Sequence, residues 1–358
     1  MRTRVFSNIL RLLFVVTISP SSAYSNDGTY TGSGNHLVPV KETDISLQKE
    51  ILTIRKRINT AGVSVYYELF NPGEERDVQV GFEADNTNFP ANVYPINGGH
   101  PYINNFTVNV NGKSVKYTIS YLLNGESIPN NKRAITLPKL KQYIDKNSES
   151  ATYVFVYAFK VRFKNGLNII RHDYDYEMSS SIGTSYSFDY KLTPANRWAN
   201  GQIDDFTLVL DLGDYEGINL NLLNDTYKDY FTFTGSGHFG REKPKCEKEM
   251  NENVFIENGQ LIFHHKNFHP EEELSFSSSS IWYDYDSDNE KRTLTYLPYS
   301  LSAQESYIDE QLTPLEQKVL QNIQLARDGY IFPDKDLYNY FINKTNWYVP
   351  IPEYDPDK

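Results

Sequence analysis

Hydrophobic and polar residues alternate along most of the chain, which is the period expected of β-strands with one buried face. The run 63–69 alternates in this way and ends at Asn71-Pro72-Gly73, after which the run 78–82 repeats the pattern. These two runs are therefore predicted to form a hairpin. Asn111-Gly112 separates the alternating runs 106–110 and 115–119, and this dipeptide is the strongest short-range hairpin signal.

Residues 153–163 form the clearest predicted strand. One face is hydrophobic at every second position, and the other changes from Val154 and Val156 to Lys160 and Arg162, so the strand should pass from buried to solvated. Many short strands separated by turns predict a mainly β chain with one or two β-sandwich-like domains. We place them at 26–145 and 146–297, the second being a separate domain or a continuation of the first. A short helix within 137–146 separates the two ranges.

The pattern becomes helical near the C-terminus. Thr313-Pro314-Leu315-Glu316 combines an N-cap Thr, a Pro at the first helical position and a Glu three residues after the cap, which is a capping box. Apolar residues follow at helical spacing until Gly329, and a second short helix begins near Asp334. The sequence therefore predicts a linker at 298–311, a small C-terminal α-helical module at 312–349 and a tail at 350–358.

The segment LARDGYIF, residues 325–332, ends the first helix of this module, and aromatic residues follow it. It resembles the YARHG domain of exported bacterial proteins, with Leu325 in place of the family's Tyr and Asp328 in place of its His. The resemblance implies an extracytoplasmic location and binding at the cell envelope, without an established activity. The β-rich part is similar, more weakly, to uncharacterised exported bacterial β-domain proteins, in which a strand like DISLQKEILTI precedes a V-x-V-x-Y strand. The matching positions of the module are Ala326, Arg327, Gly329, Tyr330, Phe332, Leu337, Tyr340, Phe341, Trp347 and Tyr348.

Residues 1–25 have the order of a secretory signal peptide. Arg2, Arg4 and Arg11 precede a short apolar run at 12–18, and small residues follow around Ala23. The run is shorter than the roughly 20 residues that span a bilayer, although a short membrane anchor or a buried strand is an alternative. Cleavage changes the formal net charge from −11 to −14, because the segment holds three Arg and no acidic residue. A chain this acidic is repelled by phosphate backbones, so nucleic acid is not an expected partner.

Two segments contain candidate metal ligands. The lone Cys246 supplies neither a disulfide nor a thiolate cluster. His264, His265 and His269 lie close in sequence to three Glu residues and could ligate zinc. On a strand, however, His264 and His265 point to opposite faces, so a solvated hairpin is the alternative. The segment DYDSDNE, residues 284–290, alternates carboxylates as calcium loops do, but it lacks the Gly and the final Glu of such a loop.

Two further motifs carry candidate chemistry. GSGHFG, residues 235–240, fits the G-x-G-x-x-G pattern of dinucleotide sites, but no helical pattern follows it, which favours a loop. HDYDYE, residues 172–177, supplies carboxylates of the kind that hydrolases use. No Ser stands in a Gly-flanked nucleophile elbow.

Arg327 has two interpretations. A cation in the last helical turn stabilises the helix dipole, and Gly329 then ends the helix. Alternatively, Arg327, Trp347 and Tyr348 form a small surface that grips a sugar or a peptide. The predicted function is a non-enzymatic exported binding protein of the cell envelope that recognises cell-wall glycan, peptide or a surface protein and needs no cofactor. The alternatives are a metal-assisted or carboxylate-based hydrolase in the β-rich region, with weakly bound calcium or zinc, and a structural assembly subunit.

Overall fold

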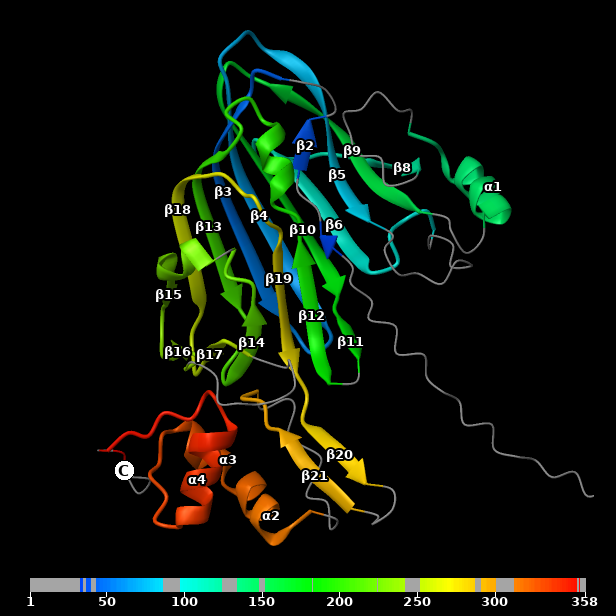
Figure 1. The fold of residues 1–358 in the computed structure, drawn as a ribbon. Helices are drawn as coiled ribbons and strands as arrows, with labels where there is room; N and C mark the ends of the chain where they lie inside the picture. The colour runs from blue at the N-terminus through cyan, green and yellow to red at the C-terminus, as the bar shows by residue number, and fades with distance from the viewer. Residues whose placement is uncertain are drawn as a thin grey trace, which may run out of the picture.

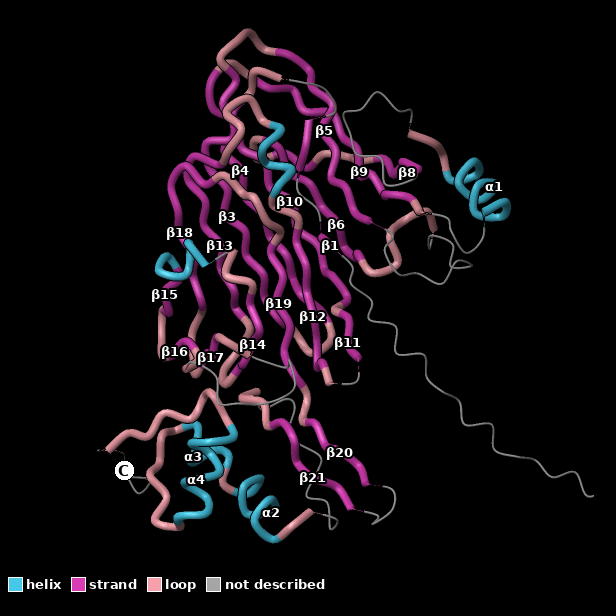
Figure 2. The backbone as a smooth tube through the Cα atoms, viewed as in Figure 1, coloured by secondary structure: helices cyan, strands magenta, loops and turns pink. Residues whose placement is uncertain are grey.

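The structure, a computed structural model, consists mainly of β-strands, so the predicted fold class is confirmed (Figures 1 and 2). Within the part of the chain that the structure describes, no helix is both long and apolar enough to cross a membrane. The predicted signal peptide, Cys246 and most of the predicted linker lie outside the described residues. The described residues are 33–34, 37–39, 43–85, 97–123, 134–147, 152–181, 183–223, 225–241, 252–286, 291–300, 312–352 and 354.

The largest sheet has eight strands, which come from distant parts of the sequence. In order across the sheet they are β15 (Phe231–Phe233), β18 (Leu261–Phe268), β13 (Ile203–Asp211), β3 (Ser46–Lys56), β4 (Thr60–Asn71), β10 (Gly166–Glu177), β6 (Ile103–Val110) and β7 (Lys113–Ser114). Neighbouring strands are antiparallel except β13 and β3, which pair in parallel. Lys49 on β3 and Asp205 on β13, 156 residues apart, form a 3.5 Å ion pair across this parallel pair.

Two smaller sheets complete the body of the protein. The seven-stranded sheet contains β1 (Ser33–Gly34), β12 (Thr184–Tyr190), β19 (Leu274–Ser279), β14 (Glu216–Leu220), β17 (Val254–Ile256) and β16 (Gly237–Phe239), with β11 (Ser179–Ser181) paired to β12. The four-stranded sheet contains β2 (Leu37–Pro39), β5 (Arg76–Asp85), β9 (Tyr153–Phe163) and β8 (Thr118–Leu123). The helices of the body are α1 (Leu137–Asn147), η2 (Thr193–Arg197) and η3 (Asp225–Tyr230).

The inward faces of the three sheets share one hydrophobic core. Leu52 of β3, Phe82 of β5, Phe188 of β12 and Phe206 of β13 all belong to it and are almost fully buried. Strands from both predicted β ranges pair within the same sheets, as β4 does with β10 and β5 does with β9. The core therefore extends across residue 145, where the sequence placed a boundary.

The predicted hairpin of runs 63–69 and 78–82 is wrong. Both runs are strands, β4 and β5, but β4 pairs with β3 and β10, whereas β5 pairs with β2 and β9. Between them the buried Asn71 donates through its amide to the carbonyls of Glu74 and Lys164, at 3.0 and 3.2 Å. At the predicted hairpin turn, the chain therefore passes from the eight-stranded sheet to the four-stranded sheet.

Two local predictions are confirmed, the turn at Asn111-Gly112, although not its pairing of runs 106–110 and 115–119, and the burial of strand β9. Asn111 and Gly112 have positive φ angles of 49° and 81° and join β6 to β7 with Val110 opposite Lys113, which is a two-residue hairpin. The second strand of this hairpin is only two residues long, and the chain then leaves to form β8 in another sheet. Strand β9 is buried on both faces at its start and exposes Lys160 and Arg162 near its end, as its sequence predicts.

The C-terminal part forms a separate cluster below the sheets in Figure 1. It combines the hairpin β20 (Trp282–Asp286) and β21 (Lys291–Tyr296) with helices α2 (Pro314–Gln321), α3 (Ile323–Arg327) and α4 (Lys335–Lys344). We call these elements the C-terminal lobe. The lobe has its own hydrophobic core, which also includes Phe255 from β17 of the body. The predicted helices are confirmed, with a break at Asn322 between α2 and α3.

The predicted capping box is present and also fixes helix α2 to the hairpin. The Thr313 hydroxyl accepts the Glu316 N–H, and the buried Glu316 carboxylate accepts the Thr313 N–H at 2.8 Å. The same carboxylate accepts the Leu294 N–H of β21 at 2.9 Å. Glu316 thereby joins two elements that lie far apart in the sequence.

Glu316→Ala is expected to lower the free energy of unfolding of the lobe by about 2–3 kcal/mol, because a helix cap and a buried backbone partner are lost together. Urea unfolding followed by circular dichroism measures the change. Gln321→Ala, at an exposed position of the same helix, is the control and should change stability by less than about 0.5 kcal/mol. Equal effects of the two substitutions would contradict this role of Glu316.

Candidate functional site

Helix α3 ends at the LARDGYIF segment through a Schellman motif. Gly329 has a φ of +81°, and its N–H donates to the Ala326 carbonyl at 3.1 Å. The Tyr330 N–H donates to the Leu325 carbonyl at 2.9 Å. These two bonds satisfy carbonyls that the helix end would otherwise leave free. Gly329 therefore ends helix α3 in the left-handed conformation that the sequence predicts.

Arg327 points into the junction between the lobe and the body. Its residue is only 8% exposed, and its guanidinium lies 5.9 Å from the ring centroid of Tyr215 and 5.5 Å from that of Tyr299. Its Nε and Nη2 atoms have no hydrogen-bond acceptor among the described residues. Burial lowers the pKa of Arg327 to about 10, an effect that the neighbouring Tyr299 and Glu252 partly oppose. Two aromatic faces thus replace the usual carboxylate partner of a buried arginine.

Trp347 and Tyr348 also face inward. They are 1% and 0% exposed, and both belong to the core of the lobe. The Trp347 indole N–H donates to the Leu297 carbonyl at 3.0 Å, and the Tyr348 hydroxyl donates to the Tyr330 carbonyl at 2.7 Å. A lobe this small needs its aromatic residues to fill its own core. Arg327, Trp347 and Tyr348 therefore do not present the ligand-binding surface that the sequence suggested.

Asp328, the residue that follows Arg327, also bonds across the junction. Its carboxylate accepts the hydroxyl of Tyr215, at the start of β14, at 3.1 Å, and that of Tyr354 at 3.3 Å. On the body side, His238 lies 2.9 Å from the carbonyl of Trp347. Arg327, Asp328 and the Trp347 carbonyl consequently hold the lobe against the body.

A buried carboxylate lies behind Arg327. Glu252 is fully buried, and its two oxygens accept the N–H groups of Ser279 and Tyr299 at 3.2 and 2.9 Å. Burial raises the pKa of Glu252 to about 7, against the opposing effects of these two N–H donors and of Arg327. This carboxyl is therefore poised to change its charge near neutral pH.

The three candidate zinc ligands do not come together. His264 Nε2 lies 2.9 Å from Asp205 Oδ1 on the outer face of β18, whereas the His265 ring packs 4.5 Å from the Tyr230 ring on the other face. His269 Nδ1 lies 2.6 Å from the Gly201 carbonyl in the following turn. The two-residue period of a strand separates the first two, as predicted. Across the described ranges, no three His, Cys, Asp or Glu side chains form a metal-binding group.

The other motifs have local explanations or lie partly outside the described residues. In GSGHFG, Gly237 begins β16, and a Cβ there would lie 2.4 Å from the Phe233 ring, so close packing of strands accounts for this glycine. Residues 287–290 of the acidic segment 284–290 are not among the described residues. HDYDYE lies on β10, where His172, Tyr174 and Tyr176 point inward and the acidic residues point outward.

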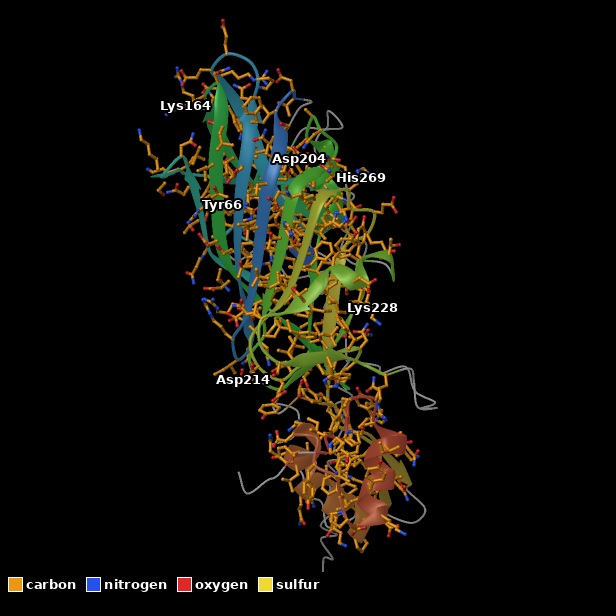
Figure 3. The ribbon with its side chains drawn as sticks, turned by 90° about the vertical axis from the view of Figure 1, so that its left-hand side faces the viewer. Tyr66, Lys164, Asp204, Asp214, Lys228 and His269 are labelled. Carbon is orange, nitrogen blue, oxygen red and sulfur yellow. The ribbon has the colours of Figure 1, made fainter. Side chains whose placement is uncertain are left out.

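A polar groove crosses the outer face of the eight-stranded sheet. Figure 3 labels Tyr66, which lies on β4 of this sheet. Its volume is about 480 Å³, and side chains of β3, β4, β6 and β10 line it. The strand register places Thr53, Ser64, Asp173 and Thr107 side by side in one row. The Asp173 carboxylate is exposed and has no hydrogen-bond partner within the described ranges. A ligand in the groove would therefore meet three hydroxyl groups and a free carboxylate.

Arg57 supplies the positive charge at the end of this groove. Its Nη1 lies 2.6 Å from Asp175 Oδ1, and the Asn105 amide donates to Asp175 Oδ2 at 2.7 Å. A Cβ at Gly62 would lie 3.1 Å from Arg57 Nη2, so this glycine leaves room for the guanidinium to lie across the strand. The Arg57 side chain is 57% exposed, which leaves most of its N–H donors facing solvent. Arg55 also lines the groove and is paired with Asp211 at 2.7 Å.

Comparison with known proteins identifies no family. No family model matches the sequence, and a search of the curated proteins finds no match. A Legionella pneumophila protein described as a "putative nutrient binding protein" aligns with 93% of this chain and 95% of its own, with a TM-score of 0.47 and 18% identity. The resemblance of the lobe to YARHG domains therefore rests on its residues alone.

Two further solved structures align with part of the chain. An M1 zinc metallopeptidase of Deinococcus radiodurans matches 77% of this chain and 52% of its own, with a TM-score of 0.28 and 9% identity. Yeast LTA4 hydrolase in complex with bestatin matches 67% and 29%, with a TM-score of 0.26 and 7% identity. This chain thus spans about half or less of either hydrolase. At these TM-scores the comparisons assign no activity to it.

Sequence reasoning found only part of the groove. Of the candidate catalytic carboxylates in HDYDYE, Asp173 and Asp175 line the groove. Arg55 and Arg57 were missed. Their signal was weak but present, because basic residues at positions 55 to 57 end a strand whose earlier residues alternate.

Proposed function

We propose that this chain is a non-enzymatic, exported binding protein of the cell envelope and that its ligand binds in the polar groove of the eight-stranded sheet. The observation that carries the proposal is the pairing of exposed Arg57 with Asp175 beside the free carboxylate of Asp173. The signal-like segment 1–25 supports export, because the order of its residues is that of a secretory leader.

A glycan suits this groove better than an apolar ligand. Sugar hydroxyls both donate and accept hydrogen bonds, and the groove offers both kinds of partner within one row of strands. Arg57 and Asn105 donate, Asp173 accepts, and Thr53 and Thr107 can do either. Nearby on the same face, Tyr66 presents a half-buried ring, with the Arg171 guanidinium 4.9 Å from its centroid. A peptide of a cell-wall or surface protein, with charges of both signs, would use the same groups.

Asp173→Ala and Arg57→Ala are each expected to weaken binding of mature protein to isolated cell walls at least about tenfold, since a hydrogen bond to a charged group contributes about 1.5–3 kcal/mol. Cosedimentation and calorimetry with soluble cell-wall fragments measure the change. Glu272→Ala, at an exposed position after β18, is the matched control.

Two results would contradict the proposal. One is that Asp173→Ala and Arg57→Ala both bind cell walls with the affinity of the wild-type protein, which would place the ligand outside the groove. The other is recovery of the protein from the cytosol with residues 1–25 still attached, which would remove the cell wall as its partner.

A further inference from the structure

A second cavity lies at the turn between β3 and β4, beside the groove. Its volume is about 490 Å³, within the range of roughly 300–1,000 Å³ that is typical of small-molecule sites. It opens at the edge where the eight-stranded and seven-stranded sheets approach each other, since β12 contributes to its wall. Its lining residues are Lys56, Arg57, Ile58, Asn59, Ser185, Tyr186 and Leu212.

Lys56 lines this cavity and belongs to a buried ion pair with Glu216, which we call the floor. Lys56 Nζ contacts Glu216 Oε1, and the two side chains are only 12% and 6% exposed. The ammonium also lies 4.7 Å from the ring centroid of Tyr186. These contacts with Glu216 and Tyr186 hold the Lys56 ammonium in place in the absence of a ligand.

The carboxylate of the floor has no capacity left for a ligand. Glu216 Oε1 is bonded to Lys56, and Oε2 accepts the hydroxyls of Tyr186 at 2.9 Å and Ser300 at 3.1 Å. Burial and the charge of Glu216 raise the pKa of Tyr186 well above its ordinary value, so this hydroxyl remains a donor to Glu216. Both carboxylate oxygens of Glu216 therefore already accept hydrogen bonds from side chains of the protein.

Hydrogen-bond donors are in excess. An ammonium has three N–H groups and a guanidinium has five. Among the described residues, Lys56 gives one of its N–H groups to Glu216, and Arg57 gives one side-chain N–H to Asp175. The lining also holds two aliphatic side chains, Leu212, which is buried, and Ile58, which is 94% exposed at the rim. A ligand that fits must bring acceptor oxygens and a short apolar part.

We propose that this cavity is a second binding site, specific for a small aliphatic carboxylate whose oxygens meet Lys56 and Arg57 and whose chain lies against Ile58 and Leu212. This site differs from the groove in its position and, apart from Arg57, in its residues. It therefore goes beyond the proposed recognition of the cell wall, and either site can be absent without the other.

The test compares 3-methylbutanoate with its neutral isostere, 3-methylbutanamide, by titration calorimetry on the mature protein. The acid should bind, and the amide should bind at least about tenfold more weakly, because a hydrogen bond between charged groups is lost. Inorganic phosphate is the third probe. Phosphate that binds as well as 3-methylbutanoate would overturn the assignment of the apolar wall, and an amide that binds as well as the acid would overturn the assignment of the charge.

Ile58 gives matched variants that leave the fold intact, because its side chain is almost fully exposed. Ile58→Asp places a negative charge at the rim and should weaken binding of 3-methylbutanoate by about two- to fivefold. Ile58→Lys should strengthen it by a similar factor, and added salt should reduce both effects. Variants that bind equally would overturn the proposal.

A double substitution tests the floor without leaving an unpaired buried charge. Lys56→Met combined with Glu216→Gln removes both members of the ion pair, whereas removal of Lys56 alone would leave Glu216 buried without its partner. The double variant should unfold cooperatively and bind 3-methylbutanoate at least about tenfold more weakly. A folded double variant that binds like wild type would overturn the role of Lys56.

Discussion

Trp347→Ala is expected to lower the free energy of unfolding of the C-terminal lobe by about 3–5 kcal/mol. The indole is 1% exposed and packs against the rings of Tyr299 and Phe341, with centroids 5.6 and 5.8 Å away. Its truncation would leave a cavity in the lobe core and an unpaired carbonyl at Leu297, which now accepts the indole N–H. Because a lobe of this size has little stability to spare, we expect it to separate from the body and unfold first.

Limited proteolysis and urea unfolding measure this effect. The helices 314–344 should be cleaved rapidly in Trp347→Ala while the sheets remain resistant. Trp347→Phe is the matched variant, since it keeps most of the ring and loses only the bond to Leu297, and it should cost about 1 kcal/mol. A lobe that resists the protease equally well in both variants would mean that Trp347 does not anchor it.

The stability of the junction between lobe and body is expected to fall as the pH rises through about 7, because of Glu252. Burial raises the pKa of this carboxyl from its ordinary value of 4.5 to about 7. The folded protein therefore favours the neutral form. The contribution of Glu252 is complete below about pH 4.5, where the folded and unfolded chains both hold the proton, and it is lost as the pH rises through about 7. Over this range the loss amounts to about 3 kcal/mol.

Glu252→Gln should remove most of this pH dependence, because the amide is neutral throughout. Glu216 and Arg327, the charged neighbours that act on Glu252, are present in both proteins, so the difference isolates one group. Fluorescence of Trp347 in a background carrying Trp198→Phe and Trp282→Phe would report unfolding of the lobe at each pH. The exposed Glu272→Gln serves as the control. An unchanged slope in Glu252→Gln would show that Glu252 is not the titrating group.

Local features of the fold were readable from the sequence because neighbouring residues encode them. The alternation of residues 153–163 gave both the strand β9 and the change from buried to exposed on its second face. The Thr313–Glu316 capping box and the glycine at 329 gave the helix ends. Each of these signals is contained within a few residues.

The pairing between distant strands could not be predicted from the sequence. The strand β4 was recognised, but its partners β3 and β10 could not be chosen over β5, because alternation states which face is buried and not which strand lies beside it. The groove depends on the same information, since Arg57 and Asp175 meet across 118 residues. The sequence does not show whether Trp347 and Tyr348 are exposed or buried, because an aromatic pair in a short module can form a binding surface or fill a core. Their burial depends on how the helices and the hairpin of the lobe pack together.

The parallel pairing of β3 with β13 has a consequence for folding during synthesis. The chain emerges from its N-terminus, so one edge of β3 has no partner strand until residues 205–211 have been made. Such a high contact order slows folding, and an open strand edge invites pairing between nascent chains. Translation that stops before residue 200 should accordingly yield aggregates, and a holding chaperone should be needed until the last strands arrive.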